Sequence, residues 1–138
     1  MSKYKAIKTD CDNIIFDSHA EMLYYVHLKE LKTCKMITDF ELQPKYILQA
    51  GFNLNGKSYR KIEYVSDFLI YELDGSKTVV DIKGFPTTEA KLKRKLFMYK
   101  FPLLKLEWLV WYGGQWVDYF ENQRRISKNK SLKKKLIV

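Results

Sequence analysis

Apolar residues recur along the chain at two spacings, and these spacings predict which segments are helices and which are strands. From Ser18 to about Thr33 they follow the helical spacing that gives a helix one buried stripe, formed by Tyr24, Tyr25, Leu28 and Leu31. A second helix is predicted from Thr87 or Thr88, either of which can cap it, to about Tyr99, before Pro102. Its expected inner stripe is Leu92, Leu96 and Tyr99.

The segments between and after the helices alternate or are continuously apolar, as strands do. The expected strands are a short one or an arm within residues 1–16, a half-buried one from Phe40 to Leu48 interrupted near Pro44, a central one from about Ser58 to Leu73, and Thr78–Lys83, Leu104–Tyr112 and Trp116–Phe120. Residues 51–56 are predicted to be a loop, and Asp74-Gly75 to close a hairpin. The order αβββαβ predicts a single α/β domain with a mixed β-sheet flanked by helices.

Composition sets the class of protein and of partner. The 138 residues are enough for one domain, expected over residues 1–123, followed by a basic tail over 124–138 that we expect to fray. With 25 Lys and Arg against 16 Asp and Glu, the net charge of +9 favours a phosphate-bearing partner, nucleic acid before membrane. Structural nucleic-acid binders share this balance, so charge alone does not indicate an enzyme.

Two further features concern where the protein acts. Cys11 and Cys34 show neither a CxxC motif nor the spacing of a disulfide framework, which favours reduced thiols. The N-terminus lacks an apolar leader, and no apolar run approaches the ~18 residues of a membrane span. We therefore expect an intracellular, cytoplasmic protein that does not enter a membrane.

Two aspartates lie within otherwise apolar strands, where acidic residues need a compensating partner. Asp81 and Lys83 are two residues apart and thus project from one face of their strand. Asp67 joins that face if the loop around Asp74-Gly75 has three or five residues, whereas a two- or four-residue loop places it on the other face. A divalent metal would compensate both carboxylates, while Lys83 could hold the attacking water or stabilise the phosphate.

Glu21 has two interpretations. Ser18 and Glu21 have the spacing of a capping box, in which Glu21 would bond the backbone amide of Ser18. Glu21 also lies one turn before the buried stripe of its helix, so it can lean toward the sheet as a metal ligand. Taken alone, the residues around Glu21 favour the cap interpretation.

Other chemistries lack their motifs. His19-x-Glu21 has the start of a deaminase motif, but no Pro-Cys-x-x-Cys follows. His19 and His27 do not have HExxH spacing, and glycine-rich phosphate loops are missing. The three tryptophans are expected to serve in core and turn packing.

The basic residues of the second helix and of the tail are predicted DNA contacts, or else ordinary solvated charges: Lys91, Lys93, Lys95, Arg124 and Arg125. Of the helical ones, Lys95 is expected to point into the cleft and Lys93 outward.

The ordered set of motifs resembles the PD-(D/E)XK nuclease superfamily, and within it the small phage-encoded endonucleases of the Holliday-junction-resolvase type. The resemblance spans roughly residues 14–112 and rests on the segments Phe16–Tyr25, Tyr64–Phe68, Val79–Gly84 and Lys93–Tyr99. It implies a restriction-endonuclease-like core and phosphodiester hydrolysis with Mg²⁺ or Mn²⁺.

The resemblance also implies roles for individual residues. Glu21, Asp67 and Asp81 would bind the metal together with the backbone carbonyl of Ile82, and Lys83 would complete the catalytic group. His19 stands where such proteins carry a basic residue for DNA. The implied partners are branched DNA and a second copy of the chain, because a four-way junction needs two symmetric cuts. The implied setting is the bacterial host of a phage. The alternative is a basic nucleic-acid-binding protein without catalysis.

Overall fold

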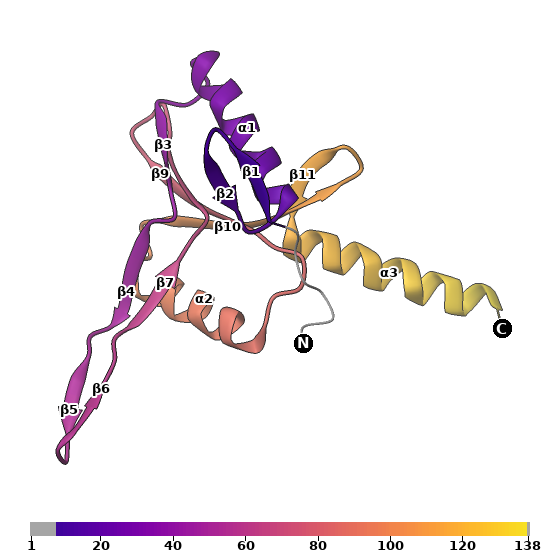
Figure 1. Ribbon diagram of the computed structural model, residues 1–138. Helices are drawn as coiled ribbons and strands as arrows, with labels where there is room; N and C mark the ends of the chain where they lie inside the picture. The colour runs from indigo at the N-terminus through magenta and orange to yellow at the C-terminus, as the bar shows by residue number, and fades with distance from the viewer. Residues whose placement is uncertain (1–7, 138) are drawn as a thin grey trace.

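Five strands form the central sheet, and helices α1 and α2 lie on its opposite faces (Figure 1). This computed structural model describes residues 8–137. The strand order is β11–β10–β9–β8–β3, formed by Gln115–Asp118, Lys105–Tyr112, Lys77–Ile82, Phe68–Tyr71 and Asp39–Leu42. β9 and β10 run parallel and the other neighbours antiparallel, so the sheet is mixed. The predicted α/β class is confirmed, and the expected αβββαβ order corresponds to α1, β3, β8, β9, α2 and β10.

Both predicted helices begin at capping side chains that sequence reasoning named. α1 spans His19–Thr33, and the Ser18 hydroxyl accepts the Glu21 N–H at 3.1 Å. α2 spans Thr88–Lys100, and the Thr87 hydroxyl accepts the Ala90 N–H at 3.1 Å. These side chains bond N–H groups that have no partner within the first helical turn.

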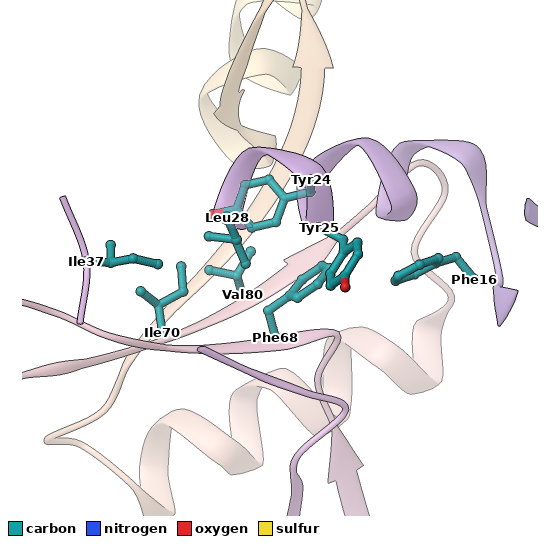
Figure 2. Close-up of a cluster of buried hydrophobic side chains, with 8 residues drawn as sticks. All are labelled: Phe16, Tyr24, Tyr25, Leu28, Ile37, Phe68, Ile70 and Val80. Atoms are coloured by element: carbon teal, nitrogen blue, oxygen red, sulfur yellow. The ribbon is translucent and has the colours of Figure 1, made fainter. Parts of the chain in front are cut away.

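Strand alternation divides the hydrophobic core into two clusters, one on each face of the sheet. On the α1 side, Phe68, Ile70 and Val80 pack against α1, as Figure 2 shows; the cluster's other members are Phe16, Tyr24, Tyr25, Leu28 and Ile37. On the α2 side, Leu69 and Val79 pack with Tyr64 and Phe97. Each half of the core therefore uses alternate residues of the same strands.

The predicted inner stripe of α2 is wrong. Leu92, Leu96 and Tyr99 are 57%, 40% and 89% exposed, whereas Phe97 is fully buried. Arg94 lies on the buried side, with its guanidinium 4.2 Å from the Phe120 ring centre and 5.5 Å from that of Trp108. An arginine can occupy an inner position when its flat guanidinium stacks on aromatic rings, and this rotates the leucines toward solvent.

The expected loop at 51–56 and the expected long strand at 58–73 are also wrong in detail. β4 (Lys45–Gln49) pairs with β7 (Ile62–Val65), and beyond them β5 (Phe52–Leu54) pairs with β6 (Lys57–Tyr59). We call these four strands the β-ribbon. Figure 1 shows it extending away from the central sheet. The long strand is thus divided into β6, β7 and β8.

The two ends of the described chain differ from expectation to different degrees. β1 (Thr9–Cys11) and β2 (Ile14–Phe16) form a hairpin beside α1, in place of the single strand or arm expected within residues 1–16, of which 1–7 lie outside the described residues. The tail expected to fray is instead part of α3, Tyr119–Ile137, which projects from the body (Figure 1). Within residues 8–137, no helix is long and apolar enough to cross a membrane.

Candidate active site

The site lies where the central sheet ends and the β-ribbon begins. Both ribbon strands break at this point: β3 gives way to β4 at Gln43-Pro44, and β7 gives way to β8 at Ser66-Asp67. The breaks are paired, because the Gln43 N–H bonds the Asp67 carbonyl at 2.9 Å and the Ser66 N–H bonds the Pro44 carbonyl at 3.2 Å. Gln43 has a φ of 49°, a left-handed conformation that turns the chain. Asp67 is therefore placed at a bend in the backbone.

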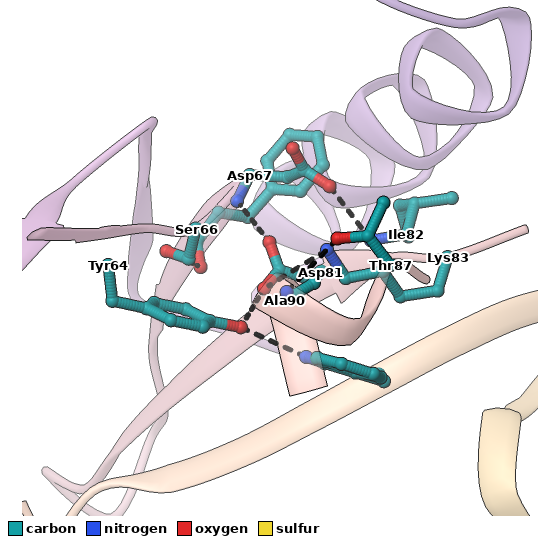
Figure 3. A network of polar contacts seen from close by, with 10 residues as sticks. Tyr64, Ser66, Asp67, Asp81, Ile82, Lys83, Thr87 and Ala90 are labelled. Atoms are coloured by element: carbon teal, nitrogen blue, oxygen red, sulfur yellow. Dashed lines mark hydrogen bonds and ion pairs between the residues drawn. The ribbon is translucent and has the colours of Figure 1, made fainter. Parts of the chain in front are cut away.

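The β8–β9 register brings Asp67 and Asp81 together. Tyr71 pairs with Lys77 and Phe68 with Val80, so five residues form the connecting loop. Five was one of the two loop lengths predicted to align the aspartates, and continuing the register places Asp67 beside Asp81. The Asp67 N–H donates to Asp81 Oδ1 at 2.8 Å, as Figure 3 shows.

Asp81 is a buried carboxylate held by a relay of hydrogen bonds. Its side chain is fully enclosed, and the Tyr64 hydroxyl donates to Oδ2. The Trp108 Nε1–H in turn donates to the Tyr64 hydroxyl at 2.9 Å. Lys83 Nζ lies 4.0 Å from Asp81 Oδ2 and 4.9 Å from the Trp108 ring centre. These contacts fix the carboxylate and keep a cation beside it.

The Asp67 carboxylate lies at the end of β8, beside β9. Its Oδ2 accepts the Ile82 N–H at 2.8 Å, a group that a backbone carbonyl would accept if β8 continued (Figure 3). Because the N–H and C=O of one strand residue point to the same side, the Ile82 carbonyl faces the Asp67 side. Asp67, Asp81 and the Ile82 carbonyl thus supply neighbouring oxygen atoms at one strand end.

Glu21 approaches the same region from the first turn of α1. It is half-buried, and it lines a cavity of about 80 Å³ together with Asp67. A cavity of this size has room for a hydrated ion or a few waters. Ser18 caps the helix through its hydroxyl, so Glu21 belongs both to a capped turn and to the lining of this cavity.

The three carboxyl groups oppose one another's ionisation. The pKa of Asp67 is raised to about 8, first by burial and then by Asp81 and Glu21, while the Ile82 N–H and Lys83 act against the shift. Burial also raises the pKa of Asp81, with Lys83 acting against the shift. For Glu21, burial and then Asp17 raise the pKa. One lysine does not offset this concentration of acidic groups, and a cation would.

The donor chemistry fits a divalent cation such as Mg²⁺, which prefers carboxylate, carbonyl and water oxygens. Asp81 already accepts two hydrogen bonds, yet a carboxylate has further lone pairs to offer. Among residues 8–137, no three His, Cys, Asp or Glu side chains gather closely enough to form a complete metal site. The residues that would hold a metal are the two neighbouring carboxylates, Asp67 and Asp81, and the Ile82 carbonyl, with Glu21 lining the same cavity as Asp67.

The predicted DNA contacts fall into separate groups on the surface. His19 is exposed at the first residue of α1, and Lys91 and Lys95 are exposed on α2. Lys93 was expected to face outward and is instead half-buried, in a groove with Arg60 and Lys61. Lys95 was expected to point into the cleft because it flanks the leucine stripe, and that stripe is exposed. Arg124 and Arg125 lie in α3, with the Arg125 guanidinium 3.8 Å from the Tyr112 ring centre.

Sequence reasoning missed the contact of Tyr64 with the site and the inward position of Arg94. A tyrosine in a strand reads as an ordinary strand former, so the hydrogen bond to Asp81 gave no local signal. Arg94 stood among basic helix residues that were interpreted either as DNA contacts or as solvated charges. A basic residue next to Phe97 at inner-face spacing was the available hint. Trp108 was correctly predicted as core, though not as a hydrogen-bond donor to the site.

Comparisons with known proteins give a family but no activity. A family model described as "Protein of unknown function (DUF1064)" matches residues 1–113, a range that contains the whole site and ends before α3. None of the curated proteins matches the chain. A solved structure titled "Crystal structure of SSO0001" aligns at a TM-score of 0.42 and 19% identity, over 72% of this chain and 49% of that chain. This chain thus spans about half the length of that solved structure.

Proposed function

We propose that this chain, which belongs to the family described as "Protein of unknown function (DUF1064)", is a metal-dependent endonuclease that hydrolyses phosphodiester bonds of DNA. The observation that carries the proposal is the pair of adjoining aspartates, Asp81 buried and Asp67 half-buried, with Lys83 at one strand end. Burying two acids beside each other costs stability, and such costs are found mainly at functional sites.

The residues divide the work as follows. Asp67 and Asp81 hold a Mg²⁺ or Mn²⁺ ion with the Ile82 carbonyl, and Glu21 contributes from α1. When bound, such a metal activates water and neutralises charge on the phosphate. Lys83 places a positive charge beside Asp81, 4.0 Å from its Oδ2, where it orients a water or stabilises the phosphate. Tyr64 and Trp108 fix the orientation of Asp81.

The proposed substrate is branched DNA, and the proposed assembly is a homodimer. Two symmetric sites are needed to cut a four-way junction on both sides. The net charge of +9 supports a DNA partner, because each phosphate neutralised by Lys or Arg releases counterions. Cys11 and Cys34 are unpaired, in keeping with a proposed cytoplasmic setting.

The test is cleavage of plasmid and of a panel of branched DNAs with Mg²⁺, Ca²⁺ or EDTA. Asp81→Asn and Lys83→Ala should each lower cleavage roughly 100-fold or more while binding is kept. Asp74→Asn in the adjoining turn and Lys77→Ala at the other end of β9 are matched controls and should cut normally. Wild-type turnover in the Asp81 or Lys83 variant would remove the proposed site.

A second candidate is a DNA-binding protein that does not cut. It is favoured by the hydrogen bonds that Asp81 already accepts from Tyr64 and Asp67, which could serve stability alone. In that case the protein would bind the same DNAs without metal-dependent cleavage, and Asp81→Asn would change its stability without changing any turnover.

A further inference from the structure

The outer half of the β-ribbon exposes large apolar side chains on both of its strands. β5 and β6 form a two-stranded sheet, and Phe52, Leu54 and Tyr59 are 44%, 56% and 39% exposed. An isolated hairpin is at best marginally stable in water, and contiguous exposed apolar groups commonly mark a binding surface. The ribbon therefore needs an explanation beyond the core.

The register gives the ribbon two chemically different faces. Phe52 pairs with Tyr59 and Leu54 with Lys57, so these four side chains share one face. The Phe52 and Tyr59 rings are stacked, with centres 4.8 Å apart and an angle of 11° between them. Asn53 pairs with Ser58 on the opposite face, where their side chains bond at 2.6 Å. We call the first of these the aromatic face.

The charge around the ribbon is suited to phosphate. Residues 50–61 contain three basic side chains, Lys57, Arg60 and Lys61, and none that is acidic. A groove of about 460 Å³ is lined by Arg60, Lys61 and Lys93 together with Val65 and Glu63. Glu63 pairs with Lys61 at 2.6 Å, which leaves Arg60 and Lys93 as the groove's other cations. Val65 lies two residues before Asp67 along the chain, so one end of the groove's lining is close in sequence to the candidate active site.

The base of the ribbon is fixed to α2. The Tyr46 ring packs edge-on against Phe97 with centres 5.0 Å apart, and Lys100 Nζ donates to the Ile47 carbonyl at 2.6 Å. At Gly51 a Cβ would lie 3.1 Å from the Tyr59 carbonyl, so glycine permits the close approach of the two strands. Because α2 follows Asp81 and Lys83 along the chain, the ribbon has a set direction relative to the site.

We propose that the β-ribbon is a DNA-binding arm whose aromatic face stacks on unpaired bases at a branch point, while the basic groove holds the phosphates that lead to the active site. The inference rests on the proposed function in taking DNA as the ligand. Aromatic rings stack on unpaired bases of any sequence. The aromatic face offers few hydrogen-bonding groups for reading the edges of paired bases. From Val65 to the tip the ribbon reaches at most about 33 Å, which places the branch within about ten nucleotides of the cut.

Binding in EDTA, where cutting cannot interfere, tests the arm directly. The full-length protein is titrated onto a forked DNA with unpaired arms and onto a fully paired duplex of equal length, followed by fluorescence anisotropy. Phe52→Ala/Tyr59→Ala should weaken fork binding about 5- to 100-fold and duplex binding far less. The matched control is Asn53→Ala/Ser58→Ala on the opposite face of the same strands, which should keep the preference for the fork.

Two further measurements keep the result decisive. Phe52→Leu/Tyr59→Leu retains apolar packing but removes the rings, so it should lose the preference for the fork even if the alanine variant misfolds. Equal fork preference in the wild type and the leucine variant overturns the inference. So does a change in sedimentation showing that the aromatic face joins two copies of the chain.

The outcome is separable from that of the nuclease proposal. A protein that binds forks through the ribbon but never cuts DNA contradicts the nuclease proposal and leaves the arm intact. A protein that cuts DNA with the same substrate preference when the aromatic face is altered contradicts the arm alone.

Discussion

At the scale of the residue, Asp67 and Asp81 show how a site can be organised at the expense of the stability of the metal-free protein. Asp67 lies beside Asp81 with its carboxylate on the Ile82 N–H, and its pKa is raised to about 8 by burial and by the neighbouring acids. In the unfolded chain the same group titrates near 3.9. The folded state thus binds this proton more tightly than the unfolded state does.

The sign of the pH dependence follows from this difference. The contribution of Asp67 to stability is fully present below the unfolded pKa and is lost as pH rises toward about 8. Asp67→Asn keeps an acceptor for the Ile82 N–H and carries no charge. We expect it to stabilise the metal-free protein at pH 7 by at least about 1 kcal/mol and to flatten the pH dependence between 5 and 8. Urea unfolding in EDTA at several pH values measures both.

Added Mg²⁺ supplies the control for this prediction. It should raise the unfolding midpoint of the wild type at pH 7 and raise that of Asp67→Asn much less, because the variant lacks one charged ligand. Parallel profiles of unfolding free energy against pH for the two proteins in EDTA would show that folding does not raise the pKa of Asp67.

At the scale of the element, α1 carries a residue with two possible duties. Glu21 lies in the first turn, where Ser18 caps the helix, and it lines a cavity with Asp67. Glu21→Gln keeps the shape and the capping ability of the side chain but removes its charge. We expect cleavage to collapse at unchanged stability, because a metal ligand needs that charge.

Ser18→Ala is the matched variant for this test. It should cost about 1 kcal/mol in the free energy of unfolding and little activity, since only the cap is lost. Thermal unfolding and cleavage at limiting Mg²⁺ distinguish the two duties. Near-normal cutting by the Glu21→Gln protein would assign Glu21 to the cap.

Helix α2 shows where sequence patterns mislead. Two sets of residues in this segment have helical spacing. One is Leu92, Leu96 and Tyr99, and the other is Arg94, Phe97 and Phe101. The sequence favours the first set because it contains two leucines. The structure uses the other set because Trp108 and Phe120 provide a surface on which Arg94 stacks. That surface comes from β10 and α3, so the sequence of α2 offered only the spacing of Arg94 and Phe97 as a hint.

At the scale of the whole molecule, local patterns predicted the layered fold. They predicted the two projecting parts, the β-ribbon and α3, less well. The main strands and two helices followed from periodicity, and the loop length after Tyr71 decided the register of the aspartates. Residues 51–56 at the outer end of the β-ribbon were predicted to be a loop because Gly51, Asn53, Asn55 and Gly56 interrupt the strand pattern there. α3 was read as a fraying tail because its sequence is polar on nearly all sides.

The projecting α3 leads to the last prediction, which concerns how the whole molecule holds DNA. Asn122 is buried, and Arg125 packs on Tyr112, so the first turns of α3 belong to the body. Beyond Ile126 the helix carries Lys128, Lys130 and three successive lysines at 133–135. A chain ending at Ile126 should therefore keep its unfolding midpoint, bind DNA more weakly and show a shallower dependence of log K on log salt. Each lost phosphate contact should lower the slope by about 0.9 on duplex DNA.

A full-length variant with those five lysines changed to glutamine should reproduce the truncation, since charge rather than packing is at issue. An unchanged salt slope in both proteins would make this part of α3 a solubilising extension with no share in binding.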